Sequence, residues 1–149
     1  MTIDEVLGPI MLPVACGLAI VAILLFAWHV ARRYPSAPKN VPLAMRIDGR
    51  PGRMASKRWL WLPPVIMAAV VALLTAVLPR AAGAAEQRTT IALVFVVMAE
   101  VAWFGAWQTD RQIELARKMT YRIAPLRTLR VFFPILVTIV VTVVVAVRP

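Results

Sequence analysis

The sequence predicts an all-α integral membrane bundle of four transmembrane helices, the third of which extends into the cytoplasm. Of the 149 residues, 61% are hydrophobic and only 16% are charged, which is more apolar than a soluble domain of this size. The apolar residues form four blocks, at about 10–31, 60–79, 90–107 and 131–147. Each block has about the 17–25 residues that cross a hydrocarbon core, where a backbone without water must be helical. We therefore expect residues 1–149 to form a single membrane domain.

The first block is expected to be a mature helix rather than a signal peptide. Its leading segment carries Asp4 and Glu5 and no basic residue, whereas a signal peptide begins with a positively charged region. We expect the helix to begin near Pro9–Pro13, since proline is tolerated in a first turn. It should end near Trp28, a residue type that suits a membrane interface. The only cysteine, Cys16, has no disulfide partner in the chain and is expected to be a small packing residue.

The second helix opens with an aromatic belt of Trp59 and Trp61, followed by two prolines that fit a first turn. Behind them, small residues recur at every fourth position on one face: Ala68, Ala72 and Ala76. Small residues at this spacing let two helix backbones approach closely inside lipid. We expect this alanine stripe to meet a neighbouring helix.

The third helix is expected to continue to about residue 122. No glycine or proline interrupts residues 108–122, and Glu114 and Lys118 stand four apart in the favourable order. The fourth helix is almost entirely β-branched and has few small residues, so we expect one of its faces to contact lipid.

The basic residues are distributed unevenly along the chain, whose formal net charge is +10. Of the 17 lysines and arginines, 14 lie in a proline-rich loop, 32–58, or in a second segment, 108–130. The positive-inside bias places both segments in the cytoplasm and both termini outside it, as in a multi-pass protein of a bacterial inner membrane. These cations either set the topology alone or also bind anionic headgroups, at about 1 kcal/mol per residue.

The loop 32–58 is rich in proline and in turn-forming pairs, so it should lie along the membrane surface or against another part of the protein. Its residues 41–58 resemble the loop motif of the domain of unknown function that begins sporulation-delay-toxin immunity proteins. That motif has a proline, a histidine two residues later, a glycine, a proline-containing turn and a serine–lysine pair before a membrane helix. The matching positions are Pro42, Gly49, Pro51, Arg53, Ser56 and Lys57, and Ala44 replaces the histidine. The resemblance covers about residues 10–80 and implies a small bacterial membrane protein that senses, protects or assists.

Glu100 is a single carboxylate within the third apolar block. An ionised carboxylate at mid-bilayer costs at least about 2.5 kcal/mol, so Glu100 should face protein or be protonated. It lies seven residues before Trp107, and Thr138 lies seven residues after Val131, so the two polar residues have similar depths. A protonated Glu100 bonded to Thr138, or to a carbonyl freed by Pro134, is the structural interpretation. A proton-relay or ion site and a pair with a cation from another subunit are the alternatives.

His29 is the only histidine, so two or three imidazoles from this chain cannot hold a metal ion. We expect an interfacial polar role; a lone axial ligand to a haem or chlorophyll is the alternative. No other cofactor is indicated. The sequence has no phosphate-binding glycine loop, catalytic acid pair or nucleophile–base pair, and its basic loops lack the interleaved aromatic residues of a nucleic-acid surface. We therefore expect neither an enzyme nor a nucleic-acid-binding protein.

These observations together predict a non-enzymatic inner-membrane protein of the immunity or accessory type, which binds a partner protein or anionic lipid through its basic loops. The main alternative is an accessory or stabilising subunit docked on a larger membrane complex, for example a respiratory or photosynthetic one. A small transporter is less favoured, because four helices with one intramembrane acid leave little to line a path.

The topology can be tested with single cysteines at positions 2 and 84, introduced after Cys16→Ala. Both should react with a membrane-impermeant maleimide in intact cells, because the charge bias places them outside the cytoplasm. A cysteine at position 36, in the loop 32–58, should react only after permeabilisation. The opposite labelling pattern would contradict the predicted orientation.

Overall fold

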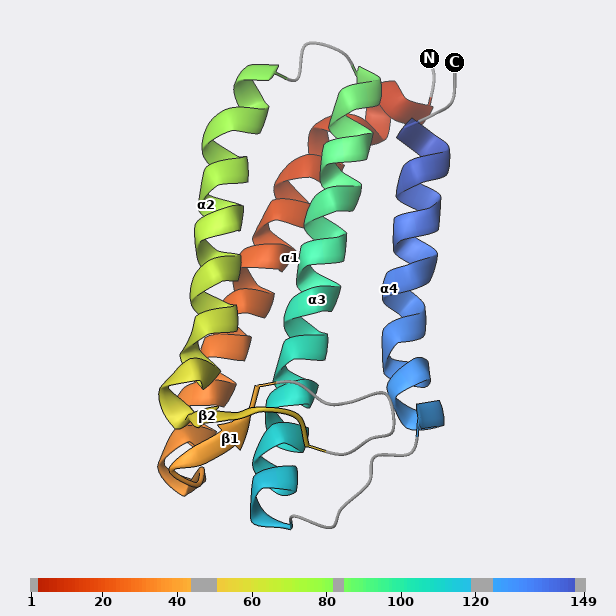
Figure 1. Cartoon of the computed structure of the whole chain (residues 1–149). Coiled ribbons are helices and arrows are strands. Elements are labelled where there is room, and N and C mark those ends of the chain that lie inside the picture. The colour runs from red at the N-terminus through yellow and green to blue at the C-terminus, as the bar shows by residue number, and fades with distance from the viewer. Residues whose placement is uncertain (1–2, 44–50, 82–84, 119–124, 147–149) are drawn as a thin grey trace.

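The computed structural model describes residues 3–43, 51–81, 85–118 and 125–146, which form four helices and one small hairpin (Figure 1). The helices are α1 (Ile3–Arg33), α2 (Leu62–Ala81), α3 (Ala85–Arg117) and α4 (Pro125–Ala146), and the strands are β1 (Asn40–Pro42) and β2 (Met54–Ser56). Two short 3-10 helices, η1 (Tyr34–Ser36) and η2 (Lys57–Trp61), lie between the hairpin and the helices α1 and α2.

Three helical stretches are long and apolar enough to cross a membrane: Ile10–Ser36, Lys57–Val77 and Arg88–Arg117. The described apolar stretch of α4, Leu129–Val144, is shorter. The prediction of four helices is therefore confirmed, whereas a fourth membrane crossing stays a prediction.

The helices extend beyond the apolar blocks that predicted them. α1 begins at Ile3 and continues through Pro13, so the expected start near Pro9–Pro13 is wrong. α4 begins at Pro125, a residue that is well suited to a first helical position. A helix can be longer than its apolar block, because hydropathy indicates only the part of the helix that fits a bilayer. The helical hydrogen bonds continue beyond that part until the sequence interrupts them. The extension of α3 is present and ends at Arg117, while residues 119–124 lie outside the described part of the chain.

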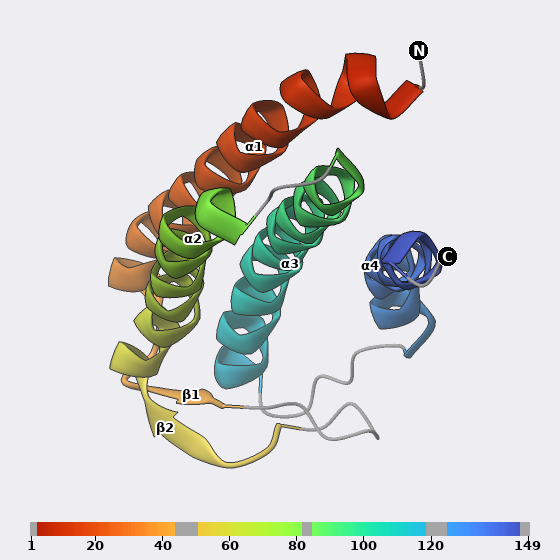
Figure 2. The same ribbon diagram turned by 90° about the horizontal axis from the view of Figure 1, so that it is seen from above.

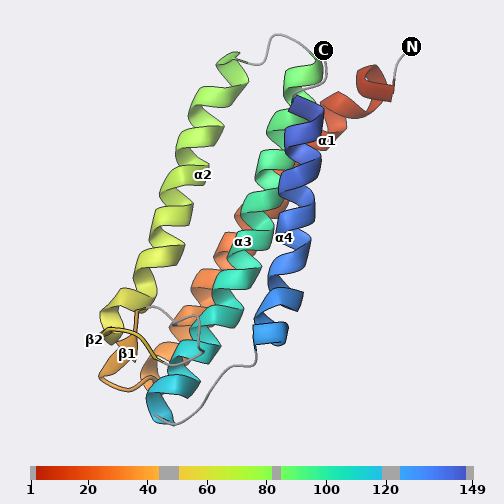
Figure 3. The ribbon, with the colours of Figure 1, turned by 45° about the vertical axis from the view of Figure 1, so that its right-hand side comes forward.

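The helix α3 is the centre of the bundle. It lies between α2 and α4 (Figure 2) and packs against each of the other three helices. The helix α4 runs alongside α3 (Figure 3), where Phe132 contacts Phe104 edge to face with ring centroids 5.6 Å apart. α1 begins and α4 ends at one end of the bundle, and the hairpin lies at the other (Figure 1). We call the end of the bundle that contains the hairpin and the last turns of α1 and α3 the basic end.

The loop 32–58 is partly folded, which the sequence did not predict. β1 and β2 pair antiparallel in the register Val41↔Ala55. Val41 and Pro42 are buried, and the Lys57 backbone N–H donates to the Lys39 carbonyl oxygen at 2.8 Å. Strands of three residues are too short to produce a visible alternation, and such a hairpin needs support from packing. The all-α class therefore needs one amendment, a two-stranded sheet.

The extension of α3 supports the hairpin through two long-range hydrogen bonds. Gln112 Nε2 donates to the Leu43 carbonyl oxygen at 3.2 Å, and Arg117 Nη2 donates to the Ser36 carbonyl oxygen at 2.7 Å. Ile113, on the same stretch of α3, is buried with Val41 in the main hydrophobic cluster. Of the two expected positions for the loop, the described residues occupy the second, against another part of the protein.

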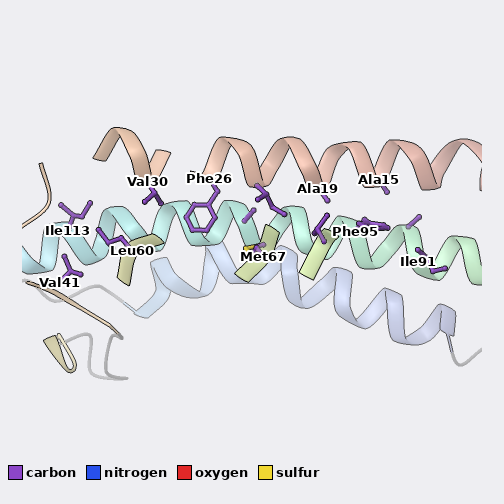
Figure 4. Close-up of a cluster of buried hydrophobic side chains, with 14 of the residues drawn as sticks. Ala15, Ala19, Phe26, Val30, Val41, Leu60, Met67, Ile91, Phe95 and Ile113 are labelled. Carbon is purple, nitrogen blue, oxygen red and sulfur yellow. The ribbon is translucent and has the colours of Figure 1, made fainter. Parts of the chain in front are cut away.

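The core is a seam between α1 and α3 in which small residues alternate with larger ones, among them the rings of Phe26 and Phe95 (Figure 4). The buried small residues are Ala15, Ala19, Ala92, Ala99 and Ala102. Phe26, which is 1% exposed, lies against Gly105 so closely that a Cβ at Gly105 would be 2.6 Å from Phe26 Cζ. Small side chains therefore let the two backbones approach, as helices do in membranes.

The alanine stripe of α2 lies beside the most buried face of that helix. Ala68, Ala72 and Ala76 are exposed, while Met67 and Val71 are buried. Ala68 and Ala72 line an open cleft together with Ile20, Ile23 and Leu24 of α1. Because α2 is apolar all round, its sequence does not reveal which face meets the bundle, and the larger side chains fill the space beside α1 and α3.

The close contact at Gly105 predicts a specific loss of stability. Gly105→Ala should destabilise the protein by about 1–3 kcal/mol, because the buried Phe26 ring must move to admit the methyl group. Gly17→Ala is the matched control, since a Cβ there meets no atom within 4 Å. Thermal unfolding in detergent would measure both variants. Equal melting temperatures for the two would contradict the proposed seam.

Candidate functional site

Glu100 lies where the α1–α3 seam meets α4. Its position near the middle of the membrane-length stretch Arg88–Arg117 is set by α3 alone, but its partner comes from α4. Thr138 Oγ1 lies 2.9 Å from Glu100 Oε1 and donates a hydrogen bond to it. The same hydroxyl is 3.2 Å from the Pro134 carbonyl oxygen of its own helix. The structure thus brings together the two polar residues that sequence spacing placed at similar depths.

Glu100 also lines a groove between α1 and α3 with a volume of about 640 Å³. The lining side chains are mainly aliphatic and aromatic, and include Phe26, Trp28 and Trp103. The groove reaches His29 on α1, where α1 and α3 approach the basic end. A volume of this size is typical of sites that hold small organic molecules.

One polar atom at this groove is buried without a partner, Oε2 of Glu100. Nε2 of His29, which also lines the groove, lies 3.0 Å from Asp110 Oδ1. A buried polar atom without a partner costs about 1–3 kcal/mol. The groove therefore combines apolar walls with one unsatisfied carboxylate oxygen, and few polar groups among apolar walls are the usual composition of a ligand site.

His29 belongs to an ionic cluster that sequence reasoning missed. Its Nε2 lies 3.0 Å from Asp110 Oδ1, and Arg33 Nε lies 3.0 Å from the same oxygen. The sequence could have indicated this contact, because each polar residue is close to a tryptophan. His29 follows Trp28, and Asp110 comes three residues after Trp107, so both polar residues are expected at the same membrane interface. His29 therefore has a protein partner on α3, while its interfacial role stays a prediction.

The residues of the loop motif have different environments. Gly49 and Ala44 lie outside the described residues. Pro42 is buried in β1 opposite Met54, and Pro51 is half-buried. The remaining three motif positions are in or beside β2: Arg53, Ser56 and Lys57.

These three positions near β2 act mainly through their backbone. The Arg53 carbonyl accepts a hydrogen bond from Leu43 N–H at 2.8 Å, and Ser56 pairs with Asn40. Lys57 Nζ lies 4.6 Å from the centroid of the Tyr34 ring, a cation–π contact. The motif positions described here therefore shape the hairpin, and they leave the Arg53 side chain exposed.

The possible metal ligands among the described residues do not form a metal centre. Within residues 10–43, 51–77, 88–118 and 129–144, no group of three or more His, Cys, Asp or Glu side chains is arranged to hold a metal ion. The arrangement at Glu100 can instead accept hydrogen bonds or pair with a single positive charge.

Comparison of the chain with protein-family models, with curated proteins and with solved structures gives no match.

The hydrogen bond to Glu100 predicts how α4 is held. Thr138→Val should destabilise the protein by about 1–3 kcal/mol, because it leaves Glu100 Oε1 without its donor. Thr142→Val is the matched control, since the Thr142 hydroxyl donates only to the Thr138 carbonyl of its own helix, at 2.7 Å. Thermal melts in detergent would compare them. If both variants melt alike, the contact does not hold α4.

Proposed function

We propose that the chain is a non-enzymatic, multi-pass protein of the bacterial inner membrane, of the immunity or accessory type, and that its basic end binds anionic lipid headgroups. In this proposal all four helices cross the bilayer, and the basic end faces the cytoplasm. The support comes from the apolar helices, the charge bias and the side chains at the basic end.

The observation that carries the proposal is a shallow cleft where η2 meets α2. It has a volume of about 330 Å³ and is lined by Arg58, Trp59, Trp61, Leu62 and Val65. A guanidinium beside tryptophan and aliphatic side chains matches an anionic lipid, whose phosphate is charged and whose chain is apolar.

The surrounding charge favours the same ligand. The two described carboxylates nearest the basic end are already paired, Asp110 with Arg33 and Glu114 with Arg111, the latter at 2.6 Å. Other described cations there are exposed and have no carboxylate partner among the described residues: Arg32, Lys39, Arg53, Arg58, Lys118 and Arg130. Juxtamembrane cations of this kind attract anionic lipids at about 1 kcal/mol each.

A second candidate function is that of an accessory subunit docked on a larger membrane complex. The exposed alanine stripe of α2, whose Ala68 and Ala72 line an open cleft beside α1, favours it, because small residues allow another transmembrane helix to approach closely. In that case the lateral faces of the bundle, rather than its basic end, would hold the partner.

The lipid proposal predicts a selective loss of bound phosphatidylglycerol. In native mass spectrometry from nanodiscs, the double variant Arg53→Gln, Arg58→Gln should retain phosphatidylglycerol about tenfold or more less well than the original chain, since two cations are lost. Arg88→Gln, at the opposite end of α3, is the matched control and should retain it normally.

Two other results would redirect the proposal. Equal retention of phosphatidylglycerol and phosphatidylcholine by the original chain would overturn lipid binding at the basic end. A stoichiometric protein partner that survives mild detergent, remains on the double variant and is lost on Ala72→Leu would support the accessory subunit instead.

A further inference from the structure

We propose that the groove between α1 and α3 binds a lipophilic organic cation, with the Glu100 carboxylate as its counter-ion. The proposal is independent of lipid binding at the basic end, because the two sites share no residue.

The side chains that line the groove determine the size and polarity of the main part of the ligand. Its volume of about 640 Å³ suits a molecule of several rings or a long alkyl chain. Leu18, Val21 and Leu25 of α1 line it together with Val96 of α3. These side chains offer no hydrogen bonds, so the body of the ligand must be apolar.

The free oxygen of Glu100 sets the charge of the ligand. Oε1 already accepts a hydrogen bond from Thr138, whereas Oε2 is buried and has no partner. A carboxylate in apolar surroundings is strongly stabilised by an opposite charge. An acyl chain in the groove would leave Oε2 unsatisfied, and an anionic headgroup would be repelled, so a cation is the complementary ligand.

Aromatic rings at the groove favour the same charge. Trp103 is three residues after Glu100, on the same side of α3, and 76% of it is exposed. Trp28 lines the groove from α1 and is 66% exposed. The faces of tryptophan rings attract cations, most strongly those with little bound water.

The same residues argue against an inorganic ion. A hard cation needs several oxygen ligands, and Glu100 is the only carboxylate that lines the groove. The carboxylate of Asp110 is occupied by His29 and Arg33, and lies ten residues, or about 15 Å, further along α3. An organic cation that carries its own apolar surface satisfies both the carboxylate and the walls.

The experiment compares two probes of the same size and opposite charge, tetraphenylphosphonium and tetraphenylborate. The purified full chain in detergent should bind the phosphonium selectively, as measured by equilibrium dialysis. Glu100→Gln should weaken that binding at least about tenfold, because it removes the counter-ion but keeps an oxygen acceptor for Thr138. Glu114→Gln, which makes the same charge change outside the groove, is the matched control and should bind normally.

Either of two results would overturn the proposal: equal binding of the two probes by the original chain, or undiminished phosphonium binding by a folded Glu100→Gln. If that variant does not elute as a monodisperse protein, Leu25→Trp tests the site with Glu100 intact. Filling the groove should then abolish phosphonium binding, and normal binding would overturn the proposal. The double variant Arg53→Gln, Arg58→Gln should bind the phosphonium normally, which separates this site from the lipid cleft.

Discussion

The close approach of α1 and α3 is the constraint on which the rest of the structure depends. Alanines on both helices and Gly105 on α3 bring the backbones together, and the Phe26 ring fills the remaining space. In a bilayer the helices gain little from hiding apolar surface, so packing contacts of this kind decide which faces meet. Once α1 and α3 are joined, α2 and α4 have defined sides of α3 against which to pack, and the groove lined by Glu100 is formed between the joined helices.

Polar contacts between helices add to the packing between α1 and α3. The hydroxyl of Thr138 reaches Glu100 from α4, and the Asp110 carboxylate on α3 meets His29 and Arg33 at the last turns of α1. Each contact joins two helices at a particular height, so the register of the bundle is specified by chemistry as well as by shape. Only one oxygen of the Glu100 carboxylate has a hydrogen-bond partner in the described protein, so the other oxygen can interact with a ligand in our proposal.

The basic end shows how a proline-rich loop can acquire structure without a core of its own. Its strands are short, but α3 continues past the apolar stretch and supplies the hydrogen bonds from Gln112 and Arg117 that hold the connecting backbone. The extension of α3 thus gives the described part of this charged loop a defined position. Arg58 lies beside Trp59 and Trp61 of η2 at this end of the bundle, which is the arrangement that supports lipid binding in our proposal.

The sequence by itself determined the helical class, the four apolar segments and the uneven charge, because these depend on residue type and order along the chain. It also placed Glu100 and Thr138 at one depth, since helical rise converts residue number into height. Only the tertiary structure decided which faces meet: on α2, Met67 and Val71 are buried, while the alanine stripe remains exposed beside them. The hairpin, the Asp110 cluster and the groove also depend on the tertiary structure, because each joins residues far apart in the chain. The sequence of a helix that is apolar on every side does not indicate which side contacts a neighbouring helix.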